Sequence, residues 1–169
     1  TTRKDTSMRE GKVRFGILGC ARIVRRAMHA GIEQSGVAET VAIASRSAGT
    51  AAEWSRELGI PRHYDSYDAL VDDPEIDAVY IPLPNELHRP WTLRAAAAGK
   101  HVLCEKPLGL DVEDARAMVE GCRQHNVQLM EAFMWRHHPR VDHVRRMLDE
   151  GTLGELRLVK LDFSFEIDR

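Results

Sequence analysis

Short runs of apolar residues recur along the chain up to residue 132, and polar segments separate them. The runs are apolar at nearly every position, which is typical of parallel strands that are buried on both faces of a sheet. A strand with one face in water would instead alternate apolar and polar residues. We therefore predict five parallel strands, over residues 13–18, 40–45, 78–83, 101–104 and 127–132.

Segments with helical signals fill the gaps between these runs. Asn85 and Asp111 are favourable N-cap residues, and Gly59, Gly99 and Gly151 stand where a helix can end in a left-handed residue. The regular alternation of strand and helix predicts an α/β fold with a doubly wound parallel sheet of the Rossmann type. The predicted helices span residues 23–34, 50–58, 87–98, 112–125 and 140–150.

The last apolar run, LRLVKLDFSF at residues 156–165, has a different pattern. Val159 and Leu161 fall on one face and Lys160 on the other, as in an antiparallel strand with one apolar face. We interpret this strand as the start of a second α/β domain with an open antiparallel sheet, most of which lies outside this sequence. The predicted organisation is a tail at 1–12, a cofactor-binding domain at 13–153 and the start of the second domain at 154–169.

Composition and charge mainly exclude classes of function. The 24 Lys and Arg residues nearly balance the 26 Asp and Glu residues, which argues against binding to nucleic acids or anionic membranes. No apolar run approaches the ~20 residues of a membrane-spanning helix, and no signal peptide is evident. The three cysteines form no CxxC pair, and no histidine pattern indicates a metal site. We therefore expect a cytoplasmic protein with reduced thiols and no bound metal.

The first predicted strand leads through a glycine-containing turn into a helix, in the segment VRFGILGCARIVRRA. This order suits a dinucleotide whose pyrophosphate lies at the start of the helix. The G-x-G-x-x-G pattern is incomplete, because Gly19, Ala21 and Val24 occupy its three glycine positions. Ala21 allows close approach of the backbone but adopts positive φ less readily than glycine. An ordinary strand-to-helix turn is the alternative interpretation.

The end of the second strand indicates which dinucleotide is bound. Sites for NAD commonly place Asp or Glu here to hold the ribose 2′-hydroxyl, but this chain reads Ala44-Ser45-Arg46-Ser47. A guanidinium can bind a 2′-phosphate through two hydrogen bonds, and the neighbouring hydroxyls can donate to it. The pattern favours NADP(H) over NAD(H). The alternative is that Arg46 is a solvated surface charge.

Two later turns place polar residues at the carboxyl edge of the sheet. In IPLPNELH, the two prolines end the third strand, so Leu83, Asn85 and His88 fall near the edge where ligands of such sheets bind. A plain surface histidine is the alternative for His88. In HVLCEKPLGLD, Lys106 follows the fourth strand and Pro107 stiffens the turn. Lys106 could act as general acid and base beside a bound nicotinamide, with Glu105 orienting its ammonium group. The alternative is a simple surface turn.

These segments together carry a family resemblance. GILGCA, AIASR, DAVYIPLPNELH, AGKHVLCEKPL, LMEAFMWRHHP and LDEGTLGELR follow one another as they do in the Gfo/Idh/MocA oxidoreductases. The chain most resembles the branch that contains NADP-dependent D-xylose dehydrogenase, dimeric dihydrodiol dehydrogenase and nucleotide-sugar 3-ketoreductases. The resemblance covers nearly the whole chain, and the Glu-Lys-Pro turn is its most specific mark.

The resemblance implies a role for individual residues. It makes Lys106 the catalytic lysine of an NADP(H)-dependent oxidoreductase that acts on a sugar, a sugar derivative or a vicinal diol. It also implies a homo-oligomer that forms through the second domain. The residues implied to contact the cofactor are Gly19, Cys20, Ala21, Arg22, Ile23, Ser45, Arg46, Leu83, Pro84, Asn85, His88, Glu105, Lys106, Trp135 and Arg136.

A different class of function stays open at this stage. The chain could be a dinucleotide-binding module without catalysis, acting as a sensor or a partner-binding domain. A short-chain dehydrogenase is disfavoured because no tyrosine is followed four residues later by lysine. Binding of NADPH without turnover by the intact protein would favour the module.

Overall fold

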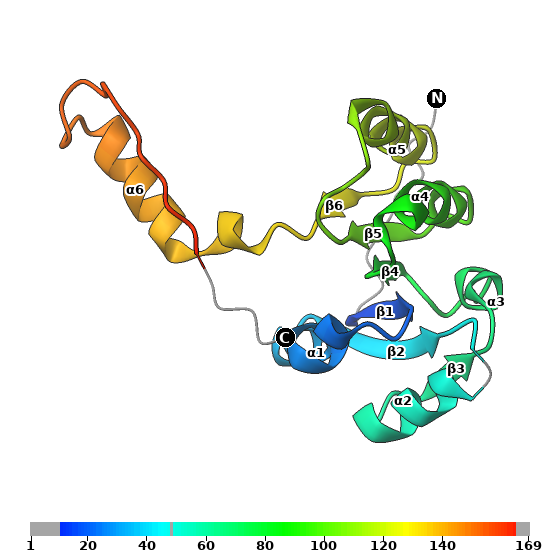
Figure 1. Cartoon of the computed structure of the whole chain (residues 1–169). Coiled ribbons are helices and arrows are strands. Elements are labelled where there is room, and N and C mark those ends of the chain that lie inside the picture. Colours follow the sequence, from blue (N-terminus) through cyan, green and yellow to red (C-terminus); the bar gives the residue numbers. More distant parts are fainter. Residues whose placement is uncertain (1–10, 48, 165–169) are drawn as a thin grey trace. The chain divides into compact units, whose positions relative to one another are not determined.

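The computed structural model describes residues 11–47 and 49–164 of the chain. Its centre is a sheet with the strand order β3-β2-β1-β4-β5-β6, in which every neighbouring pair is parallel (Figure 1). The predicted doubly wound parallel sheet is therefore confirmed. The strands are β1 (Val13–Leu18), β2 (Ala38–Ala44), β3 (Arg62–Tyr64), β4 (Ala78–Ile81), β5 (His101–Cys104) and β6 (Leu129–Glu131).

The helices connect consecutive strands, as parallel pairing requires. Two of them begin with a distorted turn: a π-helix over Val24–Met28 leads into α1, and a 3₁₀ helix over Asn85–Leu87 leads into α4. Asp111 caps α5 as predicted, because its carboxylate accepts a hydrogen bond from the backbone N–H of Asp114 at 2.8 Å. The helices of the sheet domain are α1 (His29–Gln34), α2 (Thr50–Leu58), α3 (Tyr67–Val71), α4 (His88–Ala97) and α5 (Val112–Gln124).

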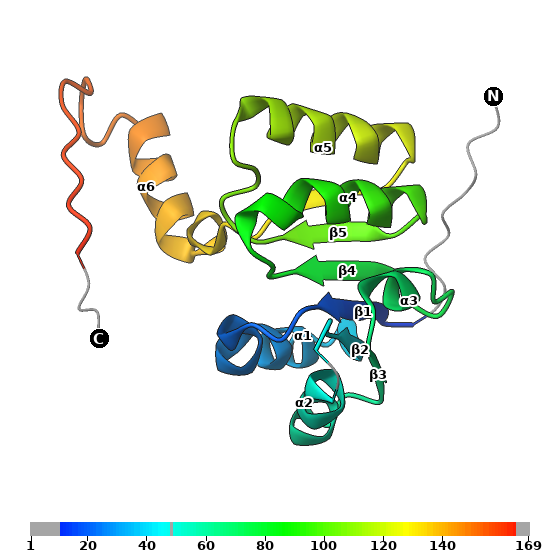
Figure 2. The ribbon, with the colours of Figure 1, turned by 45° about the vertical axis from the view of Figure 1, so that its right-hand side comes forward.

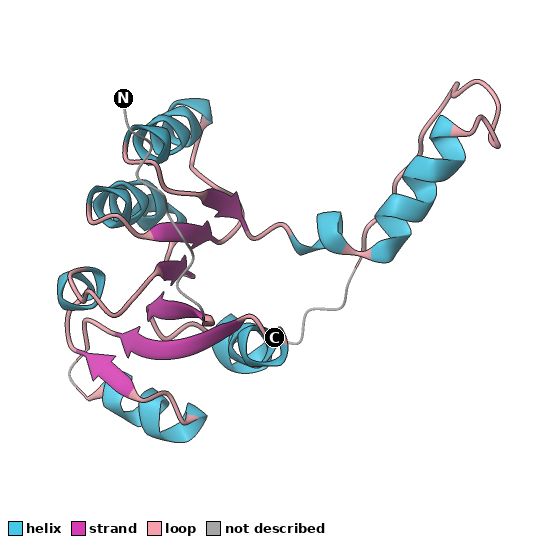
Figure 3. Ribbon diagram, turned by 180° about the vertical axis from the view of Figure 1, so that it is seen from behind, coloured by secondary structure: helices cyan, strands magenta, loops and turns pink. Residues whose placement is uncertain are grey.

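Successive strand residues face opposite sides of the sheet, and each side forms its own core. On one side, Ile17, Ile43 and Tyr80 pack with Val24 and Trp54, which come from the π-helical turn and α2. On the other side, α3, α4 and α5 line the sheet, as Figures 2 and 3 show from two directions. β4 is buried at every position, and β1 and β2 each end in three consecutive buried residues, which explains why these stretches are apolar without alternation.

Two elements were not expected from the sequence, and one expected element is absent. The strand β3 is three residues long and polar, and the helix α3 has only five residues, so neither gives a periodic signal. The sequence also predicts a strand over 156–165, but residues 156–164 belong to no helix or strand. A strand needs a neighbour to pair its backbone groups, and the described residues offer this segment none. Residue 165 lies outside the described residues.

The chain divides into two compact units between Ala132 and Phe133. The second unit contains a 3₁₀ helix, Met134–His137, and α6, Pro139–Asp149. No residue of α6 is buried, and Leu158 and Leu161 beyond it are exposed. The domain boundary expected after residue 153 stays a prediction. Within the described residues, no helix combines the length and apolarity needed to cross a bilayer.

Charged pairs join the strands at the amino edge of the sheet. Arg14 on β1 donates from Nε and Nη2 to the two carboxylate oxygens of Asp77, at 2.9 and 2.8 Å, just before β4 begins. Lys100, which is 7% exposed, donates to the backbone carbonyls of Asp73 and Ile76 at 2.7 and 2.8 Å. Such fork-like pairs fix geometry as well as contributing energy, so this network ties β1, β4 and the start of β5 together.

Replacing Asp77 by asparagine should lower stability at neutral pH, and by less in acid. The side-chain hydrogen bond from Arg14 holds the pKa of Asp77 below its ordinary value. A lowered pKa means that the carboxylate stabilises the fold above its unfolded-state pKa of about 4, and that this contribution is lost as the pH falls through the folded-state pKa. Urea unfolding at pH ~7 and pH ~3 should show a larger difference between wild type and Asp77→Asn at the higher pH.

The matched control is Glu75→Gln, because Glu75 also pairs with Arg14. The Glu75 side chain is 60% exposed, against 37% for Asp77, so solvent screens its pair more strongly. Its loss should change stability less. An equal effect of the two substitutions at pH ~7 would contradict the assignment of the lowered pKa to the Arg14–Asp77 pair.

Candidate active site

The predicted site residues gather at the carboxyl edge of the sheet. The chain builds β1, β2 and β3 outward on one side, then crosses over to β4, β5 and β6 on the other. Ligands of open α/β sheets bind where the strand order reverses in this way. Here the reversal lies between β1 and β4. The turns that begin at Gly19, Ser45, Pro82 and Glu105 follow β1, β2, β4 and β5, so they meet at this edge.

Gly19 has a conformation that only glycine adopts readily. Its φ is 106°, and a β-carbon on it would lie 2.8 Å from Cδ2 of Leu83 in the loop after β4. The dihedral angle therefore favours glycine, and any larger residue would also displace the Leu83 side chain. Its N–H donates to the Ala44 carbonyl at 2.9 Å, which fixes the turn against the end of β2. The first position of the glycine pattern is thus structurally justified.

Ala21 is compatible with the same turn. It is not among the residues with positive φ, so alanine causes no backbone strain there. The helical segment that follows spans 22–34 and starts with Arg22 and Ile23. Cys20, in the turn, pairs with the Ser45 hydroxyl, and burial raises the pKa of its thiol. The thiol is therefore held in its protonated form beside the turn.

Ser45 and Arg46 form the turn after β2. Ser45 is buried, and its hydroxyl accepts a hydrogen bond from the Ser47 N–H at 3.1 Å. Arg46 is exposed and lies over the ring of Tyr67, with 5.9 Å from its Cζ to the ring centroid. The Tyr67 hydroxyl is also 3.6 Å from where a β-carbon of Gly19 would stand. Tyr67 thus lies beside both turns, and sequence analysis missed it because α3 has no clear periodic pattern.

The loop after β4 contains Leu83, Pro84 and Asn85. Leu83 is 8% exposed, whereas Pro84 and Asn85 are exposed. The expected N-cap role of Asn85 is wrong, because Asn85 is the first residue of the 3₁₀ helix and the residue before it, Pro84, makes no side-chain cap. The amide of Asn85 is therefore not engaged by the helix end.

His88 needs a correction. The resemblance places it among residues that face the cofactor, but its side chain is 0% exposed. Its Nδ1 lies 2.9 Å from the carbonyl oxygen of Pro107, and its Nε2 lies 2.9 Å from that of Leu83. Both ring nitrogens are thus occupied by the backbone of two site loops. His88 is neither a surface histidine nor placed to contact a ligand directly.

The Lys106 turn presents an unpaired ammonium group. Lys106 is exposed, and within the described part of the chain its ammonium makes no ion pair or hydrogen bond. The expected pairing of Glu105 with that ammonium is absent. One oxygen of Glu105 instead accepts a hydrogen bond from the Tyr80 hydroxyl at 2.7 Å, and the other accepts from the backbone N–H of Lys106 at 3.1 Å. The ammonium is free to act on a ligand.

Trp135 and Arg136 lie in the second unit, on the 3₁₀ helix Met134–His137. The Trp135 ring makes an edge-on contact with Phe133, with 5.5 Å between the ring centroids. Both residues are exposed within this unit. Their predicted contact with a cofactor stays a prediction.

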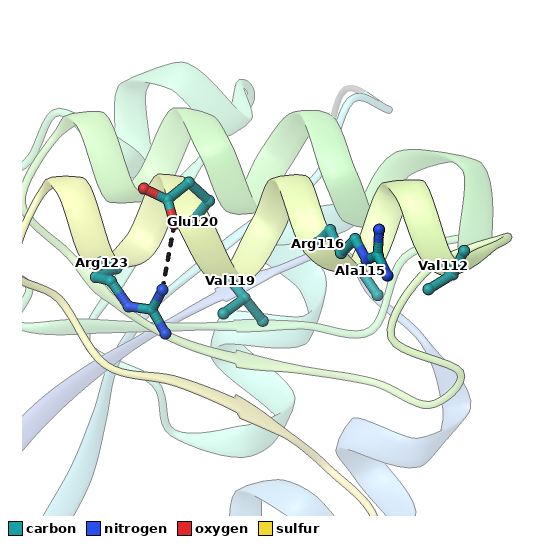
Figure 4. A pocket seen from close by; sticks show the side chains of 6 residues that line it. All are labelled: Val112, Ala115, Arg116, Val119, Glu120 and Arg123. Atoms are coloured by element: carbon teal, nitrogen blue, oxygen red, sulfur yellow. Dashed lines mark hydrogen bonds and ion pairs between the residues drawn. The ribbon is translucent and has the colours of Figure 1, made fainter.

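A shallow, mainly apolar hollow lies on the surface of α5 (Figure 4). It is formed by one face of a single helix, and Glu120 and Arg123 form an ion pair across it. None of its residues belongs to the carboxyl-edge turns. No group of three or more potential metal ligands occurs in residues 11–47 and 49–164. The lining residues are Val112, Ala115, Arg116, Val119, Glu120 and Arg123.

The chain resembles known proteins in sequence as well as in fold. A model of the Gfo/Idh/MocA family, described as an oxidoreductase family with an NAD-binding Rossmann fold, matches residues 13–133. The chain belongs to this family. The matched range ends just after β6, so family membership rests on the complete parallel sheet and on all the turns described above.

Relatives come from each branch that the sequence resembles. The chain is 44% identical over 153 residues to a D-xylose 1-dehydrogenase (NADP(+)) of Haloferax volcanii, which covers 90% of this chain and 46% of that protein. It is 39% identical over 129 residues to the trans-1,2-dihydrobenzene-1,2-diol dehydrogenase of Mus musculus, covering 76% of this chain and 39% of that protein.

A solved structure extends the comparison to three dimensions. The 3-ketoreductase of Actinomadura kijaniata, crystallised with NADP and TDP-benzene, superposes with a TM-score of 0.80 at 41% identity. The match covers 86% of this chain and 44% of that one. The chain thus spans less than half the length of these relatives.

Proposed function

We propose that the protein is an NADP(H)-dependent oxidoreductase that acts on a sugar, a sugar derivative or a vicinal diol. Hydride would pass between the nicotinamide and the carbon that carries the hydroxyl or carbonyl group. The observation that carries the proposal is Lys106, exposed and unpaired among the described residues on a turn at the strand-order reversal. Family membership and the named activities of the relatives support it.

The residues of the edge fit a dinucleotide. The Gly19 turn offers a backbone without a side chain for close approach to a pyrophosphate. Beside it, Arg46 and the Ser47 hydroxyl can hold a 2′-phosphate, and no carboxylate at the end of β2 would repel it. Bound NADP would supply the hydride acceptor or donor. The chain's own part is to position the dinucleotide and to move one proton.

Lys106 accounts for the proton that must move when hydride is transferred. In oxidation of an alcohol, bound NADP would accept hydride from the carbon, and the amine form of Lys106 would take the hydroxyl proton as the carbonyl forms. In reduction, the ammonium returns the proton to the developing alkoxide. Within residues 11–47 and 49–164 no carboxylate pairs with the Lys106 ammonium, so no ion pair holds it away from a substrate hydroxyl.

Replacing Arg46 by alanine should weaken binding of NADPH far more than binding of NADH. Hydrogen bonds to a charged group contribute about 1.5–3 kcal/mol, so the Kd for NADPH should rise about 10- to 100-fold. The Kd for NADH should change less than about threefold, because NADH has no 2′-phosphate. Calorimetric titration of the chain with both nucleotides measures the two constants.

Arg116→Ala is the matched control, because Arg116 is an exposed arginine on α5, away from the carboxyl-edge turns. It should leave both constants unchanged. If Arg46→Ala weakens the binding of NADPH and of NADH equally, Arg46 does not recognise the 2′-phosphate. Absence of binding of either nucleotide to the folded wild-type chain would contradict the cofactor proposal itself.

A dinucleotide-binding module without catalysis is the second candidate. The observation that favours it is that the matched family model is described by an NAD-binding Rossmann fold, which such a module would share. Tight NADPH binding without turnover of sugars or diols by the intact protein would support it. The second domain, the homo-oligomer and the cytoplasmic location expected from the sequence stay predictions.

A further inference from the structure

The backbone of the Lys106 turn is held by side chains from outside the turn. The N–H of Leu108 donates to Oε1 of Glu131 at 2.9 Å. The carbonyl of Pro107 faces Nδ1 of His88, also at 2.9 Å. The two residues that follow Lys106 are therefore each fixed by a partner that lies far away in the sequence.

Glu131 comes to this position from β6, the last strand of the sheet. It pairs in register with Cys104, the last residue of β5, so its carboxylate stands beside the start of the turn. The Ala132 N–H donates to the Cys104 carbonyl at 2.7 Å, which continues the pairing past the strand end. Glu131 is half-buried and is the one polar residue in the segment LMEAFM at 129–134. A carboxylate in such a run suggests a specific partner, and that partner is the Leu108 N–H.

The other supports come from different elements. Tyr80 on β4 is 0% exposed, and burial together with its hydrogen bond to Glu105 raises its pKa, so the hydroxyl remains a donor to that carboxylate. His88 at the start of α4 connects the turn to the loop after β4. The turn is thus supported from β4, α4 and β6, while the Lys106 ammonium stays unpaired among the described residues.

We propose that Glu131 is a positioning residue, which holds the Leu108 N–H and so fixes the turn that presents Lys106 to the reacting carbon. The role depends on the acceptor oxygen of Glu131 rather than on its charge. This inference rests on the proposed function, because it assigns Glu131 to the placement of the proton-transferring lysine. Misplacement of a reacting group by about 1 Å can cost about 100-fold in rate.

The experiment compares Glu131→Ala with Glu131→Gln in the intact protein. Glutamine keeps an acceptor oxygen but removes the charge, whereas alanine removes both. Glu131→Ala should lower kcat about 10- to 100-fold at saturating NADP and sugar or diol, while Glu131→Gln should keep most of it. The Kd for NADPH should change less than about threefold in both variants. Glu131 contacts Leu108, and cofactor binding is assigned mainly to the turns after β1 and β2.

Amide hydrogen exchange tests the contact itself, without any turnover. The Leu108 N–H should exchange about tenfold faster in Glu131→Ala than in Glu131→Gln or wild type, because one hydrogen bond is lost. Thermal unfolding checks that both variants fold. Glu120→Ala is the control, since Glu120 lies on the outer face of α5 and should alter neither kcat nor exchange at Leu108.

Each contrary result has a separate meaning. If Glu131→Gln loses as much kcat as Glu131→Ala, the charge matters and the acceptor role is wrong. If Glu131→Ala keeps wild-type kcat, or Leu108 exchange is unchanged, Glu131 does not position the turn. If wild type binds no NADPH or turns over no sugar or diol, the proposed function fails, and exchange at Leu108 still shows whether the contact with Glu131 exists.

Discussion

Replacing Lys106 by methionine should lower kcat by about 100- to 10,000-fold, the range that positioned acid–base groups contribute. Methionine keeps an unbranched side chain but can neither accept nor donate the proton that must move as hydride is transferred. The Kd for NADPH should change less than about threefold, because cofactor binding is assigned mainly to the turns after β1 and β2. Steady-state rates of the intact protein with NADP and a panel of sugars and diols, together with titration of NADPH, measure both effects.

Lys106→Arg separates charge from proton transfer. Arginine keeps the positive charge but does not deprotonate in proteins, so this variant should be nearly as slow as Lys106→Met. Lys12→Met is the control, because Lys12 is an exposed lysine that precedes β1 at the opposite edge. It should be fully active. Turnover near the wild-type rate in Lys106→Met would remove Lys106 from the mechanism.

Replacing Gly19 by alanine should weaken both the fold and cofactor binding. At a φ of 106° a non-glycine residue is strained, which costs about 1–3 kcal/mol of the free energy of unfolding. The new β-carbon would also lie 2.8 Å from Cδ2 of Leu83, so the Leu83 side chain in the loop after β4 must shift. That movement disturbs the turn where a pyrophosphate would bind. We expect the Kd for NADPH to rise at least about tenfold, as measured by titration of the folded variant.

Gly36→Ala provides the matched control. Gly36 also has positive φ, at 73°, but a β-carbon there would meet nothing within 4 Å. This substitution should lose stability of about 1–2 kcal/mol through backbone strain alone and leave NADPH binding unchanged. If Gly19→Ala binds NADPH as tightly as Gly36→Ala does, the glycine turn is not part of the cofactor site.

The central strands could be predicted because stretches buried on both faces of a sheet have nearly continuous apolar runs in their sequence. The predicted bounds of β1 and β5 match the structure, and β4 ends two residues early because Pro82 cannot donate to a sheet ladder. In contrast, β3 is a three-residue edge strand with the sequence RHY, which no periodicity analysis distinguishes from a loop. The alternation of strands and helices implies a parallel sheet, in which all strands end at the same edge. It was therefore predictable that the turns after β1, β2, β4 and β5 lie at one edge.

Side-chain partners were less predictable than positions. Sequence order placed His88 and Glu105 at the correct edge, but the partners of their side chains depend on how α4 and β4 pack against the turn. His88 is fully buried, and the Glu105 carboxylate accepts from the backbone N–H of Lys106 rather than pairing with its ammonium group. For Glu131 a signal did exist, since a carboxylate within an apolar run needs a reason.

The charged network of Arg14, Asp77 and Lys100 joins the strands at the end opposite the site turns. Cohesion of the sheet and chemistry are thus assigned to opposite ends of the same strands. Substitutions that tighten the amino edge can therefore raise resistance to heat or denaturant without rearranging the turns around Gly19 and Lys106. An engineered, hardier form of the protein is best sought at that end, and changes of cofactor or substrate preference at the other.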